Sequence, residues 1–283
     1  MNQAKNKKVV AENLATKPAN SQEDSPDHKL MIEERRRLIR EMVEAKGSVT
    51  VDQLAESFGI SKVSIRSDLR LLDSMGVLVR SRGGALVIRD GDDLPINIKE
   101  NLHRAQKIRI AEEAVKQIED GETIILDSGS TTAEIAKQIR GLKLNSINVI
   151  TNALNIAVLL ANTSHVNLIM LGGVLRNNSF SLSGPQAERA LDGLYADRLF
   201  LGVDSIDPEI GLMTPHLLEA QLNAKMIQIS RKVIAVADSS KLMRRNLSVI
   251  ARMDQIDTLI TDKAAPSSLV ELFNSTGVEV ILV

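Results

Sequence analysis

The spacing of hydrophobic residues changes about a third of the way along the chain. In the first part, apolar side chains recur at the 3.6-residue period of amphipathic helices, which predicts helices over residues 31–45 and 50–58 and a third that begins at Ser61. Two short apolar runs, residues 77–81 and 85–89, then flank the glycine pair of the segment RGG, as is typical of a β-hairpin. We therefore expect a small helical domain that ends in a hairpin.

Further along, short apolar runs alternate with helical segments. The runs TIIL, INVI, VNLIML and VIAVA are apolar almost throughout, as expected of strands buried on both faces of a sheet. This alternation predicts an α/β domain with a mostly parallel sheet. The predicted organisation is a disordered tail over residues 1–28, a winged helix-turn-helix domain over 29–90, a linker over 91–104 and a larger α/β domain over 105–283.

Composition excludes several kinds of chemistry. The 283 residues include no cysteine and only four histidines, which are scattered, so we expect no disulfide, no thiol nucleophile and no metal site. We also predict no catalytic residue and no cofactor. No apolar run is long enough to cross a membrane, and the first 29 residues lack the apolar segment of a signal peptide, so a cytoplasmic protein is expected.

Charge is distributed unevenly between the two predicted domains. The whole chain has a net charge of −1, but residues 29–90 carry +3 and residues 91–283 carry −4. A small basic domain can bind nucleic acid locally whatever the total charge of the chain is.

Helix-capping and turn residues make the first domain a helix-turn-helix. Thr50 and Gln53 fit a capping box at the start of the second helix, Gly59 permits the tight turn that follows it, and Ser61 caps the third helix. In this motif the start of the third helix enters the major groove, and small residues there allow close approach. The alternative is a basic face that is only solvated. We expect DNA contacts from Ser61, Lys62, Val63, Ser64, Arg66, Ser67, Arg70, Arg80 and Arg82, with further phosphate contacts from residues 35–37.

Polar or glycine-rich residues follow five of the predicted strands of the second domain. Ligands of open α/β sheets bind at the carboxyl ends of the strands, and the segment DSGSTT precedes a helix whose first amides can hold an anion. The alternative is that these residues only form turns and helix caps. No Gly-Lys pair follows, so hydrolysis of a nucleoside triphosphate is not expected. The candidate ligand-binding residues are Asp127, Ser128, Gly129, Ser130, Thr131, Thr132, Thr151, Asn152, Gly172, Gly173, Arg176, Asp204 and Lys241.

The first domain resembles the DNA-binding domain of the DeoR family of bacterial regulators of sugar metabolism. The resemblance lies in the segment from SVTVDQLAESFGIS to SRGGA. Three positions depart from the family pattern. Ser64 replaces Thr, Ser67 replaces the second Arg, and Arg82 replaces His. We expect Asp68, which faces the core side of the helix, to form a structural ion pair or hydrogen bond.

The second domain resembles the sensor domain of the same family through LDSGSTT, ITNALNIA, LGGVLR, FLGVDSID and ADSSK. That domain is similar in fold to ribose-5-phosphate isomerase, which implies a phosphorylated sugar as the effector. The isomerase phosphate loop is approximated here, but Leu201 stands where the isomerase has its first Asp, and the segment MTPH lacks the isomerase Lys. The loss of these parts favours a sensor over an enzyme. Among family members, the motifs are most similar to regulators of amino-sugar use, such as N-acetylgalactosamine.

Three functions remain open from the sequence. The leading one is a repressor that binds operator DNA as a dimer or tetramer and releases it when a sugar phosphate binds. The second is a sugar-phosphate isomerase with an added DNA-binding arm. The third is a structural or non-specific DNA-binding protein. For His216 the alternatives are a place in the lining of the pocket and, as we expect, a structural role with its hydrogen bonds satisfied.

Overall fold

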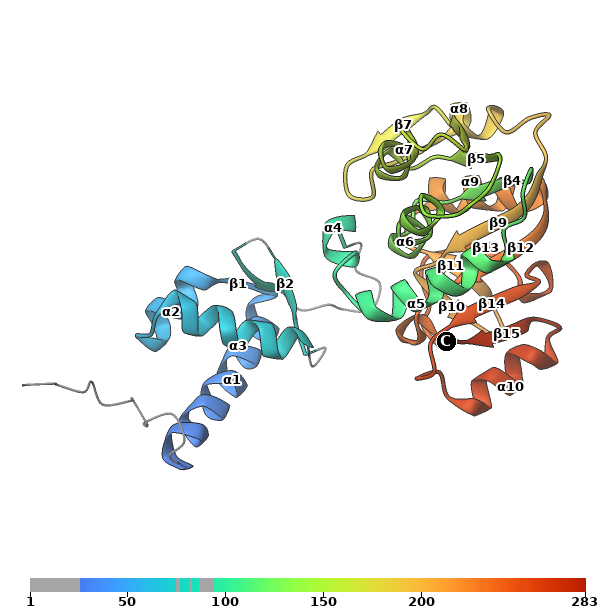
Figure 1. Ribbon diagram of the computed structural model, residues 1–283. Coiled ribbons are helices and arrows are strands. Elements are labelled where there is room, and N and C mark those ends of the chain that lie inside the picture. The colour runs from blue at the N-terminus through green and yellow to red at the C-terminus, as the bar shows by residue number, and fades with distance from the viewer. Residues whose placement is uncertain (1–25, 75–76, 82, 87–93) are drawn as a thin grey trace, which may run out of the picture. The chain divides into compact units, whose positions relative to one another are not determined.

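The computed structural model describes residues 26–74, 77–81, 83–86 and 94–283 (Figure 1). The chain divides into two compact units, Met1–Val87 and Ile88–Val283. Within the described residues, no helix is long and apolar enough to span a membrane, and no group of three or more His, Asp or Glu residues is arranged to hold a metal ion.

The first unit contains three helices and a small antiparallel sheet. Its elements are α1 (Pro26–Lys46), β1 (Ser48–Thr50), α2 (Val51–Phe58), α3 (Lys62–Ser74), β2 (Val79–Ser81) and β3 (Gly84–Leu86). The strands lie in the order β1-β3-β2, so the predicted hairpin β2–β3 is extended by a third strand. Strand β1 was not predicted, because three residues are too few to show an alternating pattern.

The predicted helix boundaries are mostly confirmed in this unit. Thr50 and Gln53 form the reciprocal capping box, and Gly59 ends α2 in the left-handed conformation at φ 63°. Helix α1 begins at Pro26, and residues 1–25 of the predicted tail lie outside the described residues. A proline is well tolerated in the first turn of a helix, because its missing N–H has no partner there. Residues such as Ile39, Leu54 and Leu69 are fully buried between the three helices.

The second unit is built on a seven-stranded parallel sheet in the order β15-β14-β12-β9-β4-β5-β6. Its strands are β4 (Thr123–Leu126), β5 (Ile147–Thr151), β6 (Val166–Met170), β9 (Ala196–Gly202), β12 (Ser230–Val236), β14 (Thr258–Thr261) and β15 (Glu279–Leu282). Its main helices are α5 (Arg104–Ala114), α6 (Ser130–Ile139), α7 (Leu154–Leu160), α8 (Pro185–Arg189), α9 (Leu217–Gln228) and α10 (Ser267–Ser275). The predicted parallel α/β domain is confirmed.

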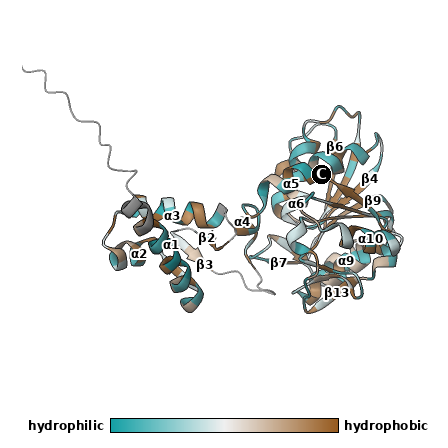
Figure 2. Cartoon of the chain, turned by 90° about the horizontal axis from the view of Figure 1, so that it is seen from below, coloured by the Kyte–Doolittle hydropathy of each residue, from teal (hydrophilic) through white to brown (hydrophobic). Residues whose placement is uncertain are grey.

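Alternate residues of each central strand enter different hydrophobic cores. Leu126 and Phe200 pack with residues of α5, α6 and α7 on one face, whereas Ile125 and Leu199 pack with residues of α9 and α10 on the other. This explains why the strands are apolar almost throughout, and Figure 2 shows β4 and β9 in the hydrophobic colour.

Several short elements were not predicted. They are α4 (Ile96–Lys99), the pair β7 (Val174–Arg176) and β8 (Ser181–Ser183), and the antiparallel sheet of β10 (Ser205–Asp207), β11 (Gly211–Thr214) and β13 (Ser248–Ala251). Three 3-10 turns add Val115–Gln117, Ser239–Lys241 and Met253–Gln255. Helix α4 falls in the segment predicted as a linker. Each of these elements has only three or four residues, which is too few for a hydrophobic period to show in the sequence.

Candidate DNA-binding surface and ligand site

One face of α3 is exposed and carries the predicted DNA-binding residues. The side chains of Lys62, Val63, Arg66, Ser67 and Arg70 are exposed, whereas those on the opposite face are buried in the core. The exposed set includes Val63, whose apolar side chain is 69% exposed. An exposed apolar side chain among cations suits contact with a base edge such as the thymine methyl group.

Ser61 caps α3 as predicted. Its hydroxyl accepts a hydrogen bond from the amide of Ser64 at 3.2 Å, and the two hydroxyls are 3.0 Å apart. The first turn of the helix therefore presents only small side chains at these two positions.

Asp68 holds α3 against α1. Its carboxylate is almost completely buried and accepts hydrogen bonds from Nε of Arg35 at 2.7 Å and Nε of Arg36 at 2.9 Å. The predicted structural ion pair is confirmed. Arg37 pairs with Glu34 and Glu41. The three arginines expected near phosphates are thus all engaged in ion pairs within the unit.

Of the two hairpin arginines predicted to contact DNA, the structure describes only Arg80. Arg80 is exposed on β2, and its amide donates to Asp73 at 3.2 Å. Arg82 lies outside the described residues. Lys62 pairs with Asp52 at 2.9 Å, but both side chains are well exposed, so this pair contributes little and can exchange for a phosphate.

In the second unit, the order of the strands reverses between β4 and β9. The chain runs outward from β4 through β5 to β6, then returns to β9 and runs the other way to β15. Such a reversal is where open α/β sheets bind ligands, beyond the carboxyl ends of the strands. Here the backbone after β4 and the backbone at the end of β9 approach closely, because a Cβ on Gly202 would lie only 3.2 Å from Cα of Gly129. Glycine at both positions permits this approach.

Asp127 follows β4 and is buried. Its Oδ1 accepts hydrogen bonds from the Thr132 hydroxyl at 2.8 Å and from the Gly129 amide at 3.1 Å. Burial raises the pKa of Asp127 to about 7, although these hydrogen bonds and one from the Gly202 amide act in the opposite direction. A carboxyl group that is partly neutral near pH 7 interferes less with a bound anion than an ionised one does.

Asp204 follows β9 and pairs with Lys99, which is not among the predicted site residues. Nζ of Lys99 donates to Asp204 Oδ1 at 2.6 Å, and the Thr214 hydroxyl donates to Oδ2 at 3.1 Å. Burial opposes ionisation of this carboxyl, but the charges of Lys99 and Lys241 outweigh it and lower the pKa of Asp204. Asp204 is therefore an ionised acceptor between two lysines.

Lys241, in the 3-10 turn that follows β12, is half-buried. Asp204 and Asp238 attract its ammonium, while burial lowers its pKa. Within the part of the chain that the structure describes, no hydrogen bond or ion pair holds the Lys241 ammonium directly. It is thus a cation without a committed partner, close to the reversal of the strand order.

Arg176 is engaged in the protein interior. Its Nη1 lies 2.9 Å from Oε1 of Glu219 in α9, and the hydroxyls of Ser179 and Ser181 donate to the same oxygen at 2.9 and 2.7 Å. This network joins α9 to the β7–β8 hairpin. The structure therefore gives Arg176 a structural ion pair, a role that its position after a strand did not indicate.

Five polar side chains have a buried atom without a hydrogen-bond partner among the described residues, and two of them are candidates for ligand contact. These two atoms are Oδ1 of Asn152, which follows β5, and Nδ1 of His216, which precedes α9; the other three belong to Asn155, Thr258 and Thr261. The expectation of a fully satisfied His216 is therefore wrong. An unpaired buried acceptor costs free energy, which a hydroxyl donor from a ligand would recover.

The other predicted residues contribute mainly to the local fold. The Thr132 hydroxyl donates to Asp127, the Thr151 hydroxyl accepts from the amide of Ala153, and Gly173 adopts φ 124° beside the backbone of Ser183. Ser130 and Thr131 are buried in the first turn of α6, Ser128 is half-buried, and Gly172 has open space around its Cα.

Sequence reasoning missed Lys99, Lys107, Thr214 and Glu219. A search limited to residues directly after strands cannot find them, because they lie on α4, α5, β11 and α9. The only local signal was Lys107 itself, a cation among the apolar positions of a helix.

Comparisons with known proteins match both units. The model of the DeoR-like helix-turn-helix domain matches residues 35–90, and that of the DeoR C terminal sensor domain matches residues 102–263. A putative aga operon transcriptional repressor of Escherichia coli O157:H7 is 41% identical over 88% of this chain and 93% of its own. The HTH-type transcriptional regulators GlpR of Haloferax volcanii and UlaR of Escherichia coli are 36% and 30% identical, each over 88% of this chain.

Solved structures share less with the chain. A ribose-5-phosphate isomerase in complex with phospho-erythronic acid is 21% identical over 50% of this chain and 54% of its own, with a TM-score of 0.38. The eIF2B beta subunit of Chaetomium thermophilum covers 84% of this chain and 86% of its own at 15% identity and a TM-score of 0.39.

Proposed function

The chain belongs to the DeoR family of transcriptional regulators, and we propose that it represses genes of sugar use until a phosphorylated sugar binds its second unit. It is a DNA-binding regulator, not an enzyme. The winged helix-turn-helix unit supplies operator binding, and the exposed residues of α3, from Lys62 to Arg70, read the major groove. The sensor unit binds the sugar phosphate that regulates DNA binding.

The observation that carries the effector proposal is the environment of Lys241. A half-buried ammonium with no direct partner among the described residues lies near an ionised Asp204 at the reversal of the strand order. A sugar phosphate matches both groups, because its phosphate pairs with the lysine and its hydroxyls donate to the carboxylate. The unpaired Oδ1 of Asn152 accepts a further hydroxyl.

We favour an amino-sugar phosphate, such as N-acetylgalactosamine 6-phosphate, as the effector. The support is the relative named as an aga operon repressor, which is 41% identical over nearly its whole length. The motifs LDSGSTT, FLGVDSID and ADSSK of the sensor unit also resemble those of regulators of amino-sugar use.

The isomerase alternative has no support in the site. Leu201, which stands where the isomerase pattern has its first Asp, is fully buried in the hydrophobic core. No carboxylate base is available at that position to move a proton between sugar carbons.

Binding to DNA half-sites one helical turn apart requires two copies of α3, so we propose a homodimer or tetramer. A regulator of this kind acts in the cytoplasm, where both operator and sugar phosphate are found.

A panel of sugar phosphates tests the proposal. Glucose 6-phosphate, ribose 5-phosphate, galactosamine 6-phosphate and N-acetylgalactosamine 6-phosphate are added to the full-length protein, and thermal stability and binding to DNA selected by the protein are both measured. A ligand at a hundredfold excess over its Kd stabilises the protein by about 2.7 kcal/mol. We expect an amino-sugar phosphate to stabilise the protein and release the DNA.

The test variant is Lys241→Met, and the matched control is Lys116→Met. The first should lose the stabilisation, and the second, which changes an exposed lysine paired with Glu113, should keep it. No response of the wild-type protein to any of the four compounds would overturn the proposed function. Turnover of any of the four compounds by the protein would support the isomerase alternative instead.

A further inference from the structure

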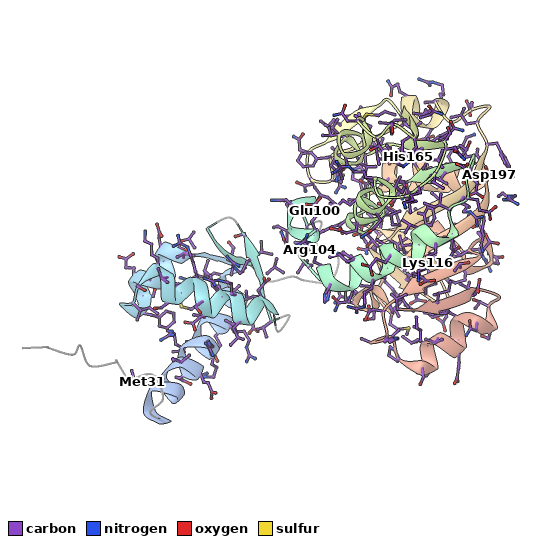
Figure 3. The ribbon with its side chains drawn as sticks, in the orientation of Figure 1. Met31, Glu100, Arg104, Lys116, His165 and Asp197 are labelled. Carbon is purple, nitrogen blue, oxygen red and sulfur yellow. The ribbon has the colours of Figure 1, made fainter. Side chains whose placement is uncertain are left out.

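Residues 144–187 of the sensor unit, all of which the structure describes, are almost without charge. The stretch contains one Arg, one His and no Asp, Glu or Lys, although 25% of the whole chain is charged. Arg176 is mostly buried and paired with Glu219. His165, which Figure 3 labels and which precedes β6, has its Nε2 3.0 Å from the carbonyl oxygen of Ile139. The surface of this stretch therefore presents no carboxylate or ammonium to the solvent.

Large apolar side chains are exposed on the same stretch. Val158 on α7 is 69% exposed and Val174 on β7 is 65% exposed, and Leu154, one helical turn before Val158, is exposed as well. The amide of Leu154 donates to the carbonyl oxygen of Phe180 at 2.9 Å, so the start of α7 meets the β7–β8 hairpin (Figure 1). The exposed apolar side chains of α7 and of the hairpin thus belong to one region, and such regions mark contact with another molecule.

Strand β6 is the free edge of the sheet on this side. Among the described strands it pairs with β5 alone, and Ile169 and Met170 are exposed on it. Edge strands are usually protected by a charged residue, a proline or a covering element. The sequence of β6, VNLIM, has neither charge nor proline, whereas the opposite edge, β15, begins with the exposed Glu279. The backbone of β6 is therefore open to pairing with a strand of another chain.

The missing charge indicates which molecule covers this surface. DNA and anionic lipid surfaces bind exposed cations, which the stretch lacks. A second copy of the chain fits, because two uncharged apolar surfaces do not repel each other when they meet about a twofold axis. Depletion of charged residues is also typical of the core of a homodimer interface.

We propose that two copies of the chain associate through this surface, named here the uncharged face: the exposed side chains of α7, of Val174 and of Phe180, together with the free edge of β6. This inference rests on the proposed function, which requires two copies of α3 on the DNA, and it names the surface that holds the copies together. Phe180 adopts φ 50° and is 43% exposed, so the fold holds an aromatic ring at the surface where it can anchor the partner.

The test compares Val158→Lys and Val174→Lys with the control Leu272→Lys in the full-length protein. Each change puts an ammonium at an exposed apolar position, but Leu272 lies on α10, which precedes β15 at the opposite edge of the sheet. Sedimentation velocity over a range of protein concentrations measures self-association. Affinity for DNA selected by the wild-type protein is measured in parallel, and thermal unfolding checks that each variant is folded.

The absence of cysteine from the chain provides a second measurement. Val158→Cys and Leu272→Cys each give a protein with a single thiol. A short bis-maleimide joins two copies only where their thiols come close together. This measurement adds no charge to the surface, so it tests the uncharged face even where a lysine variant does not fold.

We expect the wild-type protein and Leu272→Lys to form the same oligomer. Val158→Lys and Val174→Lys should each weaken self-association by about tenfold or more, because like charges would face each other across the axis. Both variants should also bind DNA more weakly than the wild-type protein. Cross-linking should be far more efficient in Val158→Cys than in Leu272→Cys.

Two outcomes separate the inference from the proposed function. If the wild-type protein self-associates and the two lysine variants do so equally well, or if Val158→Cys cross-links no better than Leu272→Cys, the uncharged face is not the interface, while the regulator function stands. If the wild-type protein is a monomer at every concentration, both free and on DNA, the proposed homo-oligomer fails and this inference fails with it.

Discussion

The carboxylate of Asp68 in α3 accepts a hydrogen bond from Nε of Arg35 in α1 at 2.7 Å, and this buried ion pair fixes the DNA-reading helix to the first helix. Arg36 pairs with the second carboxylate oxygen. The two arginines thereby pair with α3, and the opposite face of α3 remains exposed.

Replacing Asp68 with Asn should loosen α3. The change leaves two partly buried guanidinium groups facing a neutral side chain, and removal of one partner of a buried pair costs on the order of 2–4 kcal/mol. Native-state hydrogen exchange of α1 and α3 amides in the full chain measures this loss. The control is Glu44→Gln, which removes an exposed pair with Arg40 and should change little. Equal protection in the two variants would argue against the structural role of Asp68.

Replacing Arg66 with Ala should lower both affinity and selectivity for the operator. Arg66 is exposed on the face of α3, and a bidentate contact to guanine is worth about 1–3 kcal/mol of discrimination. Competition with random DNA in a gel-shift assay measures selectivity, with Arg40→Ala in α1 as a matched control. A variant that keeps full selectivity would remove Arg66 from the residues that read bases.

The buried Asp127 should give the protein a pH dependence that Asp127→Asn removes. Because burial raises the pKa of Asp127 from 3.8 to about 7, the folded protein keeps this proton at pH values where the unfolded chain has lost it. The free energy of unfolding therefore falls as the pH rises between these two values and levels off above them. The neutral Asn variant lacks this decline, so between pH 5 and pH 8 it should gain roughly 2–3 kcal/mol relative to the wild-type protein.

Denaturant unfolding of both proteins across this pH range provides the measurement. Asp254→Asn, which alters an exposed carboxylate, serves as the control and should run parallel to the wild-type protein. A parallel profile for Asp127→Asn as well would mean that Asp127 is ionised throughout.

Replacing Gly84 with Ala should disrupt the hairpin. A Cβ at this position would lie 2.0 Å from the carbonyl oxygen of Val49 on the neighbouring strand β1, which cannot move away without breaking the sheet. We expect a loss of about 3 kcal/mol or more in local stability, together with weaker operator binding. The control is Gly141→Ala, where the nearest atom would be 3.5 Å away. Normal DNA binding by Gly84→Ala would show that the sheet is not needed for it.

Much of the fold follows from local pattern. The capping box of Thr50 and Gln53, the turn at Gly59 and the apolar stripe of α3 are all properties of neighbouring residues, and each predicted element is present. The parallel sheet was predictable because its central strands are buried on both faces and are therefore apolar almost throughout. The short strands β7, β8, β10 and β11 were not, since three or four residues are too few to show an alternating pattern, and β1 and β13 were not, since they pair with strands far away in the sequence.

The candidate site divides in the same way. The sequence by itself determined that the chain has a winged helix-turn-helix unit and an α/β unit that resembles a sensor domain. It also predicted Asp127, Asp204 and Lys241 as site residues, because polar residues that end buried strands gather at one edge of the sheet. Only the tertiary structure decided which side chains face each other there. It paired Lys99 with Asp204 across 105 residues of sequence and gave Arg176 to Glu219. Such choices depend on distances between elements that no local pattern encodes.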